Sequence, residues 1–579
     1  MYSFRDLQKM CRKTVQGKEN RLAVLGTCAT QFFSMAVEGY AKLQRLNLNV
    51  FDTDYNQIDA QLIDPASDVY SFAADEILLW LGTEKIYEEF LDMDMSARSR
   101  FAQTQLQKIE RYWELISSRS NARIMQMNFH EIDDKVLGEY SCKVETTFSF
   151  QLRKLNYLLQ DAAKQNARVY IVDILSVQLR LGSRAFFNAP LYYNAKMPVA
   201  MSVLPDIAKA VVDIIMAMSG KIKKCVILDL DNTLWGGVIG DDGMAGIEIG
   251  GLGKGHVFSN LQRWFKQLRE YGIILAVCSK NEEDIAKEPF EKHDEMVLRL
   301  SDISLFVANW NDKATNVRMI QESLNIGLDS IVFLDDNPVE RELVKQKLPS
   351  IEVPELPEDP SLWLAFLQAQ NYFETVSYVG ESSDRTRQYQ VELERKRLEQ
   401  KFESIDDYLK SLEMVGTANK FEPFRYPRIA QLTQRSNQFN LRTIRYTEDD
   451  IRRIAEDERY VTQYFTLKDR FGDHGLISVV ILEKISDDEL FMDTWLMSCR
   501  VLKRGMEEFV INSVVQKAKD IGAKTVFAEY IPTSKNKMVK DIYEAMGFEK
   551  TGDRKFRLNV KDYIAKATFI KEENEHEPK

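Results

Sequence analysis

The feature that most constrains this chain is a short apolar run that ends in two aspartates one residue apart. Residues 225–228 have the length and composition of a buried β-strand, and Asp229 and Asp231 follow directly. Open parallel sheets place reactive groups at the carboxyl ends of their strands. Two carboxylates this close repel each other unless a cation or a shared proton relieves them. The pattern therefore predicts a site for a divalent metal with oxygen ligands.

Two later apolar runs of strand length also end in polar residues. One precedes Ser279, and the other precedes Asp335 and Asp336. Lys313 lies between them, in a loop that opens a helical stretch. Because the carboxyl ends of neighbouring parallel strands meet at one edge of a sheet, we expect these side chains to converge there.

The order of these groups resembles the haloacid dehalogenase (HAD) superfamily. A single D-x-D pair carries little weight, because most such pairs are solvated turns, but four motifs in order carry much more. The four are Asp229-x-Asp231-x-Thr233, then Ser279, then Lys313, and then Asp335-Asp336.

The resemblance implies a role for each of these residues. Asp229 would attack phosphorus and become an aspartyl phosphate, while Asp231 would serve as general acid and then as general base. Ser279 would hydrogen-bond a phosphoryl oxygen, and Lys313 would balance negative charge. The remaining implied contacts are Mg²⁺ bound by Asp229, the backbone carbonyl of Asp231, Asp335 and Asp336, and substrate contacts from Thr233 and Asn281.

The spacing of the motifs leaves no room for a cap domain, which many HAD enzymes carry over the site. Only about fifty residues separate Asp229 from Ser279, and the next interval is largely helical. The first interval holds a glycine-rich stretch, residues 236–255, suited to a small hairpin flap. We therefore expect a site that is open, or covered by another domain, and suited to a large or carrier-presented substrate.

Longer stretches narrow the resemblance to the FkbH-like branch, HAD subfamily IIIC. Residues 229–243 are similar to it, and residues 434–441 and 498–502 extend the similarity downstream. Members of this branch convert 1,3-bisphosphoglycerate to a glyceryl thioester on an acyl carrier protein in polyketide biosynthesis, and others are phosphatases. The resemblance implies a phosphorylated small-molecule or carrier-bound substrate, Mg²⁺ as cofactor and an acyl carrier protein as partner.

Residues 1–220 alternate short apolar runs with amphipathic stretches, which predicts a doubly wound parallel sheet. Residues 21–26 read as a strand, and residues 73–90 and 102–116 read as helices. The turn after the first strand resembles the first block of the SGNH-hydrolase fold, with Cys28 where the serine would stand. Cys28 is either a nucleophile activated at a helix start or a small buried side chain. Because no Asp-x-x-His pair follows, we interpret the domain as SGNH-like in fold and non-hydrolytic.

Beyond residue 355 the pattern changes. Prolines mark a boundary, and residues 356–414 read as a helical linker whose charged part, Asp384 to Lys401, is solvated. From residue 415 the strands and helices are similar to the GNAT acyltransferase fold, in which a loop holds the pyrophosphate of acyl-CoA at a helix start. Lys503 replaces the first glycine of that loop, which argues against ordinary CoA binding. With Arg500 it can instead hold a phosphopantetheine phosphate.

The roles of two more side chains in this region can each be interpreted in two ways. Cys499 lies beside Arg500, and a cationic surrounding lowers the pKa of a thiol. Cys499 is therefore a candidate acyl acceptor, or else a strand-end cysteine packed in the core. His474 is a candidate base or a solvated loop histidine.

Composition excludes several classes of function. The net charge of -11 argues against a nucleic-acid surface. No apolar segment approaches the ~18 residues of a membrane span, and the first residues lack the apolar core of a secretory signal. The six cysteines lie far apart with no C-x-x-C pair, which argues against a zinc ribbon or a disulfide framework and favours the cytoplasm.

The sequence thus predicts an α/β chain of three domains. They are an SGNH/flavodoxin-like parallel sheet (1–220), a Rossmannoid HAD domain without a cap (221–355) and, after the linker (356–414), a GNAT-like α+β domain (415–579). The predicted function is Mg²⁺-dependent phosphoryl transfer, coupled or not to transfer of a glyceryl or acyl group to a carrier protein. One alternative is a plain phosphatase whose outer domains serve as cap and docking modules, and another is an assembly component that only docks a carrier protein.

Overall fold

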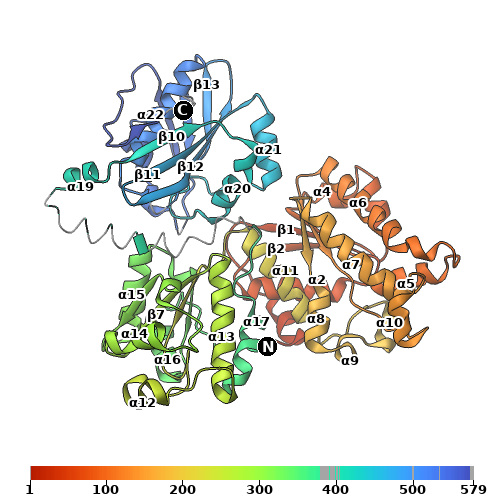
Figure 1. The fold of residues 1–579 in the computed structure, drawn as a ribbon. Helices are drawn as coiled ribbons and strands as arrows, with labels where there is room; N and C mark the ends of the chain where they lie inside the picture. Colours follow the sequence, from red (N-terminus) through yellow and green to blue (C-terminus); the bar gives the residue numbers. More distant parts are fainter. Residues whose placement is uncertain are drawn as a thin grey trace. The chain divides into compact units, whose positions relative to one another are not determined.

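The computed structural model describes residues 2–377, 390–391, 395, 398, 402, 404–498, 501–533 and 535–573. The chain divides into two compact units, Met1–Met216 and Ala217–Lys579 (Figure 1). The first unit is built on one β-sheet and the second on two, and all three belong to α/β or α+β layers.

The sheet of the first unit has five strands in the order β2-β1-β3-β4-β5. Every neighbouring pair is parallel, and this order is that of the flavodoxin-like doubly wound folds. The predicted parallel sheet is therefore confirmed. Its strands are β1 (Asn20–Gly26), β2 (Leu48–Asp52), β3 (Glu76–Trp80), β4 (Arg123–Met127) and β5 (Val169–Val172).

The prediction of a helix over residues 73–90 is wrong in its first half. The central strand β3 lies there, and α5 begins only at Thr83. All five residues of β3 are buried, so the strand shows no alternation that would separate it from a buried helix. The helices of this unit are α1 (Phe4–Met10), α2 (Gln31–Leu43), α3 (Ile58–Ile63), α4 (Asp68–Ser71), α5 (Thr83–Leu91), α6 (Phe101–Arg119), α7 (Phe148–Lys164), α8 (Ile174–Leu181), α9 (Ser183–Phe186), α10 (Ala189–Ala195) and α11 (Leu204–Met218).

The second unit begins with a four-stranded parallel sheet in the order β8-β7-β6-β9. The central strand β6 pairs with β7 on one side and with β9 on the other, so that Leu228 is level with Val277 and with Leu334. This register brings the residues that follow the three strands to one edge. The strands are β6 (Cys225–Leu228), β7 (Ile274–Ser279), β8 (Leu305–Ala308) and β9 (Ile331–Leu334).

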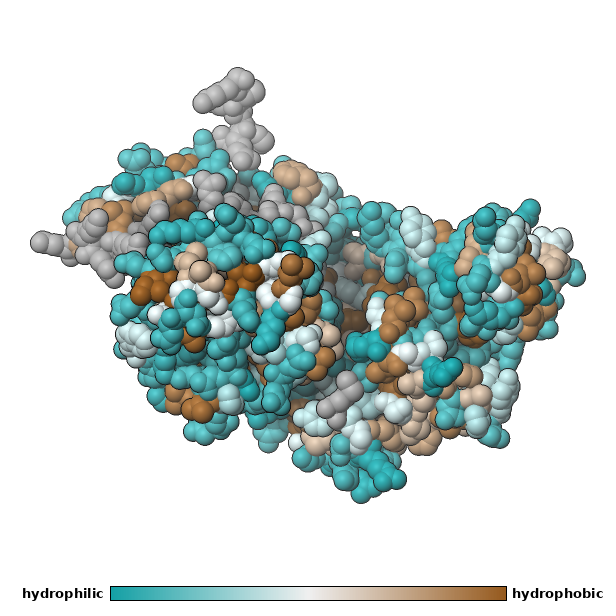
Figure 2. Space-filling model, turned by 60° about the horizontal axis from the view of Figure 1, so that its bottom comes forward, coloured by the Kyte–Doolittle hydropathy of each residue, from teal (hydrophilic) through white to brown (hydrophobic). Residues whose placement is uncertain are grey.

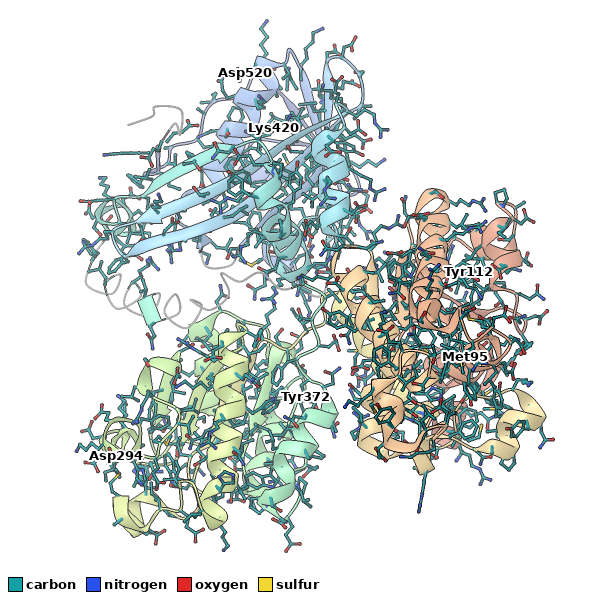
Figure 3. The ribbon with its side chains drawn as sticks, turned by 45° about the vertical axis from the view of Figure 1, so that its right-hand side comes forward. Met95, Tyr112, Asp294, Tyr372, Lys420 and Asp520 are labelled. Carbon is teal, nitrogen blue, oxygen red and sulfur yellow. The ribbon has the colours of Figure 1, made fainter. Side chains whose placement is uncertain are left out.

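Helices cover both faces of this sheet, and each face has its own hydrophobic cluster. One cluster includes Trp363 and Leu367, which are 4% and 2% exposed. Tyr372, labelled in Figure 3, also packs against it. The predicted boundary at residue 355 is therefore too early, because the segment after it completes the core. The helices are α12 (Ile239–Gly246), α13 (Gly253–Glu270), α14 (Glu283–Lys292), α15 (Lys313–Leu324), α16 (Pro338–Lys347) and α17 (Trp363–Gln370).

A short flap follows β6, and every residue from Asp229 to Lys313 is described without a cap domain among them. Two backbone hydrogen bonds between Gly236 and Glu248, of 3.0 and 2.8 Å, close the flap at its base. It contains the short helix α12 where the sequence predicts a hairpin. The expected capless HAD-type arrangement is confirmed.

The remaining sheet has eight strands in the order β15-β16-β14-β13-β12-β11-β10-β17, and it confirms the predicted α+β domain. Antiparallel pairing dominates, and β13 with β14 is a parallel pair at its centre. The strands are β10 (Val415–Asn419), β11 (Tyr460–Asp469), β12 (Gly472–Lys484), β13 (Glu489–Met497), β14 (Thr525–Glu529), β15 (Glu549–Gly552), β16 (Lys555–Asn559) and β17 (Lys571–Glu572). The helices are α19 (Ile405–Ser411), α20 (Tyr426–Arg435), α21 (Glu448–Glu456), α22 (Met506–Asp520) and α23 (Ile542–Ala545).

The segment from Asp384 to Lys401, predicted to be solvated, lies mostly outside the described residues. Among its described residues, Arg395 is 4% exposed and donates to Asp469 at 2.7 Å, which corrects that prediction for this position. His474 is 6% exposed and contacts the other oxygen of Asp469 at 3.0 Å, so it is not a solvated loop histidine. A buried charge cluster thus joins Arg395 to the β11–β12 hairpin.

The face drawn in Figure 2 is mainly hydrophilic, with hydrophobic residues in scattered patches. Within the described part of the chain, no helix combines the length and the apolar character that crossing a membrane requires.

The Asp469 cluster predicts that this domain loses stability in acid. Burial alone would raise the pKa of Asp469, but hydrogen bonds from His474 and Arg395 outweigh it and lower that pKa. Burial also lowers the pKa of His474. Both groups then bind protons more weakly in the folded state, so the free energy of unfolding falls as the pH drops below about 6.5, and again below about 4.

Replacing Asp469 by Asn should lower the free energy of unfolding at pH 7 by about 3 kcal/mol or more and flatten its dependence below pH 5. Urea denaturation at several pH values measures this. Asp473→Asn is the matched control on the same hairpin, because that carboxylate is exposed. Equal effects of the two variants would contradict the prediction.

Candidate active site

The first predicted motif lies at the carboxyl end of the central strand β6. The backbone N–H of Asp229 donates to the carbonyl of Leu334 at 2.9 Å, which continues the pairing of β6 with β9 beyond the strand itself. The Asp229 side chain is 5% exposed. A rigid, fully paired strand therefore holds this carboxylate in a dry position at the sheet edge.

Three carboxylates meet at this edge. Oxygens of Asp229, Asp335 and Asp336 all lie within 4.8 Å of one another. Asp335 is fully buried, and its Oδ1 accepts from the backbone N–H of Asn337 at 2.9 Å. Such a set of hard oxygen donors fits Mg²⁺, which prefers carboxylate and water ligands. The three predicted carboxylate ligands are thus brought together.

Lys313 supplies the positive charge that these carboxylates need. Its Nζ lies 2.9 Å from Asp229 Oδ2 and 2.6 Å from Asp335 Oδ2, and its side chain is 5% exposed. Lys313 is the first residue of α15, a helix capped by Asp312, whose side chain accepts from Thr315 N at 3.1 Å. The cap fixes the start of the helix, and the helix start aims the lysine at the cluster.

Burial governs the electrostatics of the site. Burial raises the pKa of Asp229; Lys313 opposes this, and Asp335 adds to it. Burial likewise raises the pKa of Asp336, again with help from Asp335. Burial alone would lower the pKa of Lys313, but the two carboxylates beside it outweigh that effect and raise it. The site therefore stabilises cations strongly.

The Asp231 carboxylate is held by three donors, two from the stretch after β6 and one from the residues after β7. Its Oδ1 accepts from the indole N–H of Trp235 at 3.1 Å and from the backbone N–H of Ile239 at 2.9 Å. Its Oδ2 accepts from Asn281 Nδ2 at 2.7 Å. The contact with Ile239 joins Asp231 to the first residue of the flap helix α12.

Ser279 and Asn281 lie beside Asp231. Ser279 is the last residue of β7 and is 1% exposed, and its Oγ accepts from Asn281 Nδ2 at 3.2 Å. Because that oxygen accepts here, its own O–H remains available to donate to another group. Asn281 links Ser279 to Asp231, and its predicted contact with substrate stays a prediction.

Thr233, also predicted to contact substrate, joins the first motif to the fourth. Its Oγ1 accepts from the backbone N–H of Asp336 at 3.1 Å and donates to Asp336 Oδ1 at 3.4 Å. Arg341, which the sequence reading missed, donates to the carbonyls of Asp335 and Asp336 at 2.9 and 2.6 Å. The sequence feature that could have identified Arg341 is its position on the helix that directly follows the aspartate pair.

In the first unit, Cys28 has the properties of a structural side chain. It is 3% exposed, its thiol donates to the Trp80 carbonyl at 3.9 Å, and burial raises its pKa well above the ordinary value. His130 contacts Thr83 and Glu84, at 3.1 and 3.0 Å. These contacts engage both ring nitrogens of His130, in line with the non-hydrolytic interpretation.

The loop before α22 is only partly described, and Cys499 and Arg500 lie outside the described residues. Lys503 is exposed with a φ of 61°, and its backbone N–H donates to Glu507 Oε1 at 3.0 Å. Glu507 is itself 8% exposed. A carboxylate of the protein thus accepts a hydrogen bond from the backbone N–H of Lys503, while the predicted contact of the Lys503 side chain with a phosphate stays a prediction.

Several known proteins are similar to this chain. The family model of the FkbH N-terminal domain matches residues 21–216. The solved N-terminal part of the protein BF1531 from Bacteroides fragilis, containing a phosphatase domain complexed with Mg, is 41% identical, with a TM-score of 0.62; the match covers 65% of this chain and all of that one. The ribosomal-protein-S18-alanine N-acetyltransferase from Escherichia coli is 16% identical over 25% of this chain and 94% of its own, with a TM-score of 0.20. No curated protein sequence matches the chain.

Replacing Lys313 by Met should destabilise the metal-free protein by about 3–5 kcal/mol, because it leaves two buried carboxylates facing each other without a cation. Added Mg²⁺ should then raise the melting temperature more in the variant than in the parent. Thermal unfolding with and without Mg²⁺ checks both points. Lys292→Met, which breaks an exposed pair with Glu288, should change little. A variant as stable as the parent in EDTA would contradict the expectation.

Proposed function

Because the chain belongs to the FkbH-like family, we propose that it is a Mg²⁺-dependent phosphoryl-transfer enzyme that forms an aspartyl phosphate on Asp229. One observation carries this proposal. The buried Asp229 carboxylate lies 2.9 Å from the Lys313 ammonium, within a cluster of three carboxylates at a sheet edge. A nucleophile, a charge-balancing cation and a metal site therefore coincide.

The residues divide the reaction between them. An Asp229 oxygen attacks phosphorus, the bond from phosphorus to the leaving oxygen breaks, and that oxygen takes a proton from Asp231. Asp231 then takes a proton from the water that attacks the aspartyl phosphate, which frees Asp229 and releases phosphate. Three hydrogen bonds orient Asp231 for both steps.

Charge and geometry are controlled by the neighbouring groups. The Ser279 O–H donates to a phosphoryl oxygen, and Lys313 neutralises part of the charge that gathers on the transferred group. Mg²⁺ held by Asp229, the Asp231 carbonyl, Asp335 and Asp336 would supply the charge neutralisation that lets a phosphate approach a carboxylate. Thr233 and Arg341 keep the backbone of Asp335 and Asp336 in place.

We further propose that phosphoryl transfer is coupled to transfer of a glyceryl or acyl group from a phosphorylated donor to a carrier protein. The absence of a cap between Asp229 and Lys313 favours this, because a capless site admits a carrier-bound group. The same feature also suits a plain phosphatase, in which the other domains serve as cap and docking modules. The two activities differ in whether the organic part of the donor is retained.

Replacing Asp229 by Asn should lower the turnover of p-nitrophenyl phosphate by at least about a thousandfold, because the amide cannot form the phosphoenzyme. Its fold and its melting temperature should remain close to those of the parent. EDTA should abolish the activity of the parent, and Mg²⁺ should restore it. Asp241→Asn, on the flap, is the matched control. Undiminished activity in Asp229→Asn would disprove the mechanism.

Incubation with 1,3-bisphosphoglycerate and an acyl carrier protein should distinguish transfer from hydrolysis. Intact-protein mass spectrometry would detect a glyceryl adduct on the carrier if transfer occurs, and its loss in Cys499→Ser would identify that thiol as an intermediate acceptor. Release of phosphate without any adduct would support the plain phosphatase. If neither the adduct nor free phosphate forms, the result would contradict both activities for this donor.

A further inference from the structure

The C-terminal sheet contains a fork. Strands β13 and β14 pair in parallel for four residues, from Glu489 with Thr525 to Met492 with Ala528. β13 then continues to Met497, while the pairing with β14 stops. The peptide groups that face the fork need other partners, because buried backbone N–H and C=O groups are costly to leave unpaired.

Residues 439–442 of the same chain enter this fork and form hydrogen bonds on both of its sides. The Leu441 N–H donates to the Trp495 carbonyl on β13 at 3.3 Å. On the other side, the Ile531 N–H, beyond the end of β14, donates to the Leu441 carbonyl at 2.9 Å. Asn440 forms an antiparallel bridge with Leu496. The segment therefore satisfies both open edges at once.

Arg442 lies where the two strands separate. Its Nη1 donates to Asp493 Oδ1 at 2.8 Å, and its Nε donates to Glu529 Oε2 at 3.2 Å. Asp493 directly follows the last paired residue of β13, and Glu529 directly follows that of β14. The guanidinium thus joins two carboxylates that would otherwise repel each other across the fork.

The segment is part of the domain core. Phe439, Asn440 and Leu441 are 2%, 1% and 0% exposed. The Phe439 ring packs on Trp495 with 5.4 Å between centroids, and Phe439 and Leu441 belong to the same hydrophobic cluster as β13. The fully buried Asn536 donates to the Asn440 carbonyl at 2.9 Å. Withdrawing this segment would expose apolar surface and orphan several hydrogen-bonding groups.

The fork lies next to the loop that the sequence predicts to hold a phosphopantetheine phosphate. β13 leads directly into that loop, so an arm held there by its phosphate would run along the end of β13. The two amides of a pantetheine arm need backbone partners of the kind that the fork offers. Those partners are already taken by residues 439–442, and Glu507 takes the Lys503 amide in the loop.

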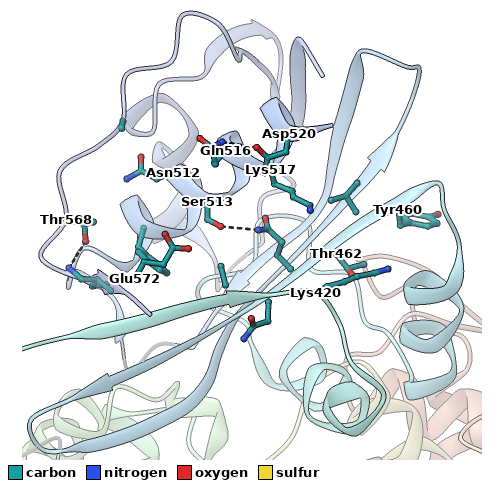
Figure 4. A pocket seen from close by; sticks show the side chains of 17 residues that line it. Lys420, Tyr460, Thr462, Asn512, Ser513, Gln516, Lys517, Asp520, Thr568 and Glu572 are labelled. Atoms are coloured by element: carbon teal, nitrogen blue, oxygen red, sulfur yellow. Dashed lines mark hydrogen bonds between the residues drawn. The ribbon is translucent and has the colours of Figure 1, made fainter. Parts of the chain in front are cut away.

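We infer that residues 439–442, held by Arg442, close this fork as a permanent part of the fold, so that the C-terminal domain takes no coenzyme A thioester there. A smaller pocket borders this segment at Phe439 and Met497, and a larger open space lies elsewhere in the domain. A cavity of about 680 Å³ lies between β10, β11 and α22, and Asn512, Ser513 and Gln516 of α22 line it (Figure 4). None of the fork residues line that cavity. The inference holds whether or not Asp229 is the nucleophile.

Hydrogen exchange of the full-length protein tests this, with coenzyme A and acetyl-coenzyme A as probes at about 1 mM, where even weak binding would register. The Met497 N–H donates to the Phe439 carbonyl at 3.0 Å. The amides of Leu441, Met497 and Ile531 should exchange more than about a thousandfold slower than those of an unstructured peptide. Neither probe should change those rates. Fast exchange without the probes, or a change in these amides with either probe, would overturn the inference.

A pair of variants tests the role of Arg442. Arg442→Ala leaves Asp493 and Glu529 without their shared cation, so exchange at Leu441 and Ile531 should become at least about tenfold faster. Arg452→Ala, which removes an exposed arginine paired with Glu448 on α21, is the control and should leave these amides unchanged. Equal rates in Arg442→Ala and the parent would overturn the role given to Arg442.

Discussion

The structure of the candidate active site depends on a conflict between like charges that the backbone enforces. Pairing of β6 with β9 carries Asp229 and Asp335 to the same edge of one sheet, in a place that excludes water. Buried carboxylates do not tolerate this closeness alone. The Lys313 ammonium lies within 3 Å of both carboxylates and offsets their repulsion within the protein itself. The oxygen cluster also fits a divalent cation, which would offset it further.

The same conflict explains why many hydrogen bonds, most of them from uncharged donors, surround the site. Thr233 and Arg341 hold the backbone at Asp335 and Asp336, and Asn281 holds Asp231 against Ser279. None of these contacts adds a further charge next to the carboxylates except Arg341, which contacts carbonyl groups. Because these contacts hold the charged groups rigidly, the groups do not have to reorient during a reaction, and the reorganisation energy stays small.

Much of this site could be predicted because each motif is local: a polar residue directly follows an apolar strand, and parallel topology gathers the strand ends. The predictions that failed have one of two physical causes. Either the residue depends on partners distant in the sequence, or its sequence pattern is compatible with both a helix and a strand. The fully buried β3 reads as helix or strand equally well. Trp235 and the fork segment 439–442 are recognisable only once their partners are known. Burial of Cys28 likewise depends on the whole domain.

The closing segment of the fork also constrains how the C-terminal domain folds. The hydrogen bond from Asn536 to Asn440 spans 96 residues of sequence, so the loop-closure entropy must be overcome before that contact stabilises anything. Until then β13 and the chain after β14 present unpaired edges, which are templates for pairing with another molecule. The chain must therefore be synthesised at least as far as Asn536 before the fork is closed, and the unpaired edges remain a risk for aggregation until then.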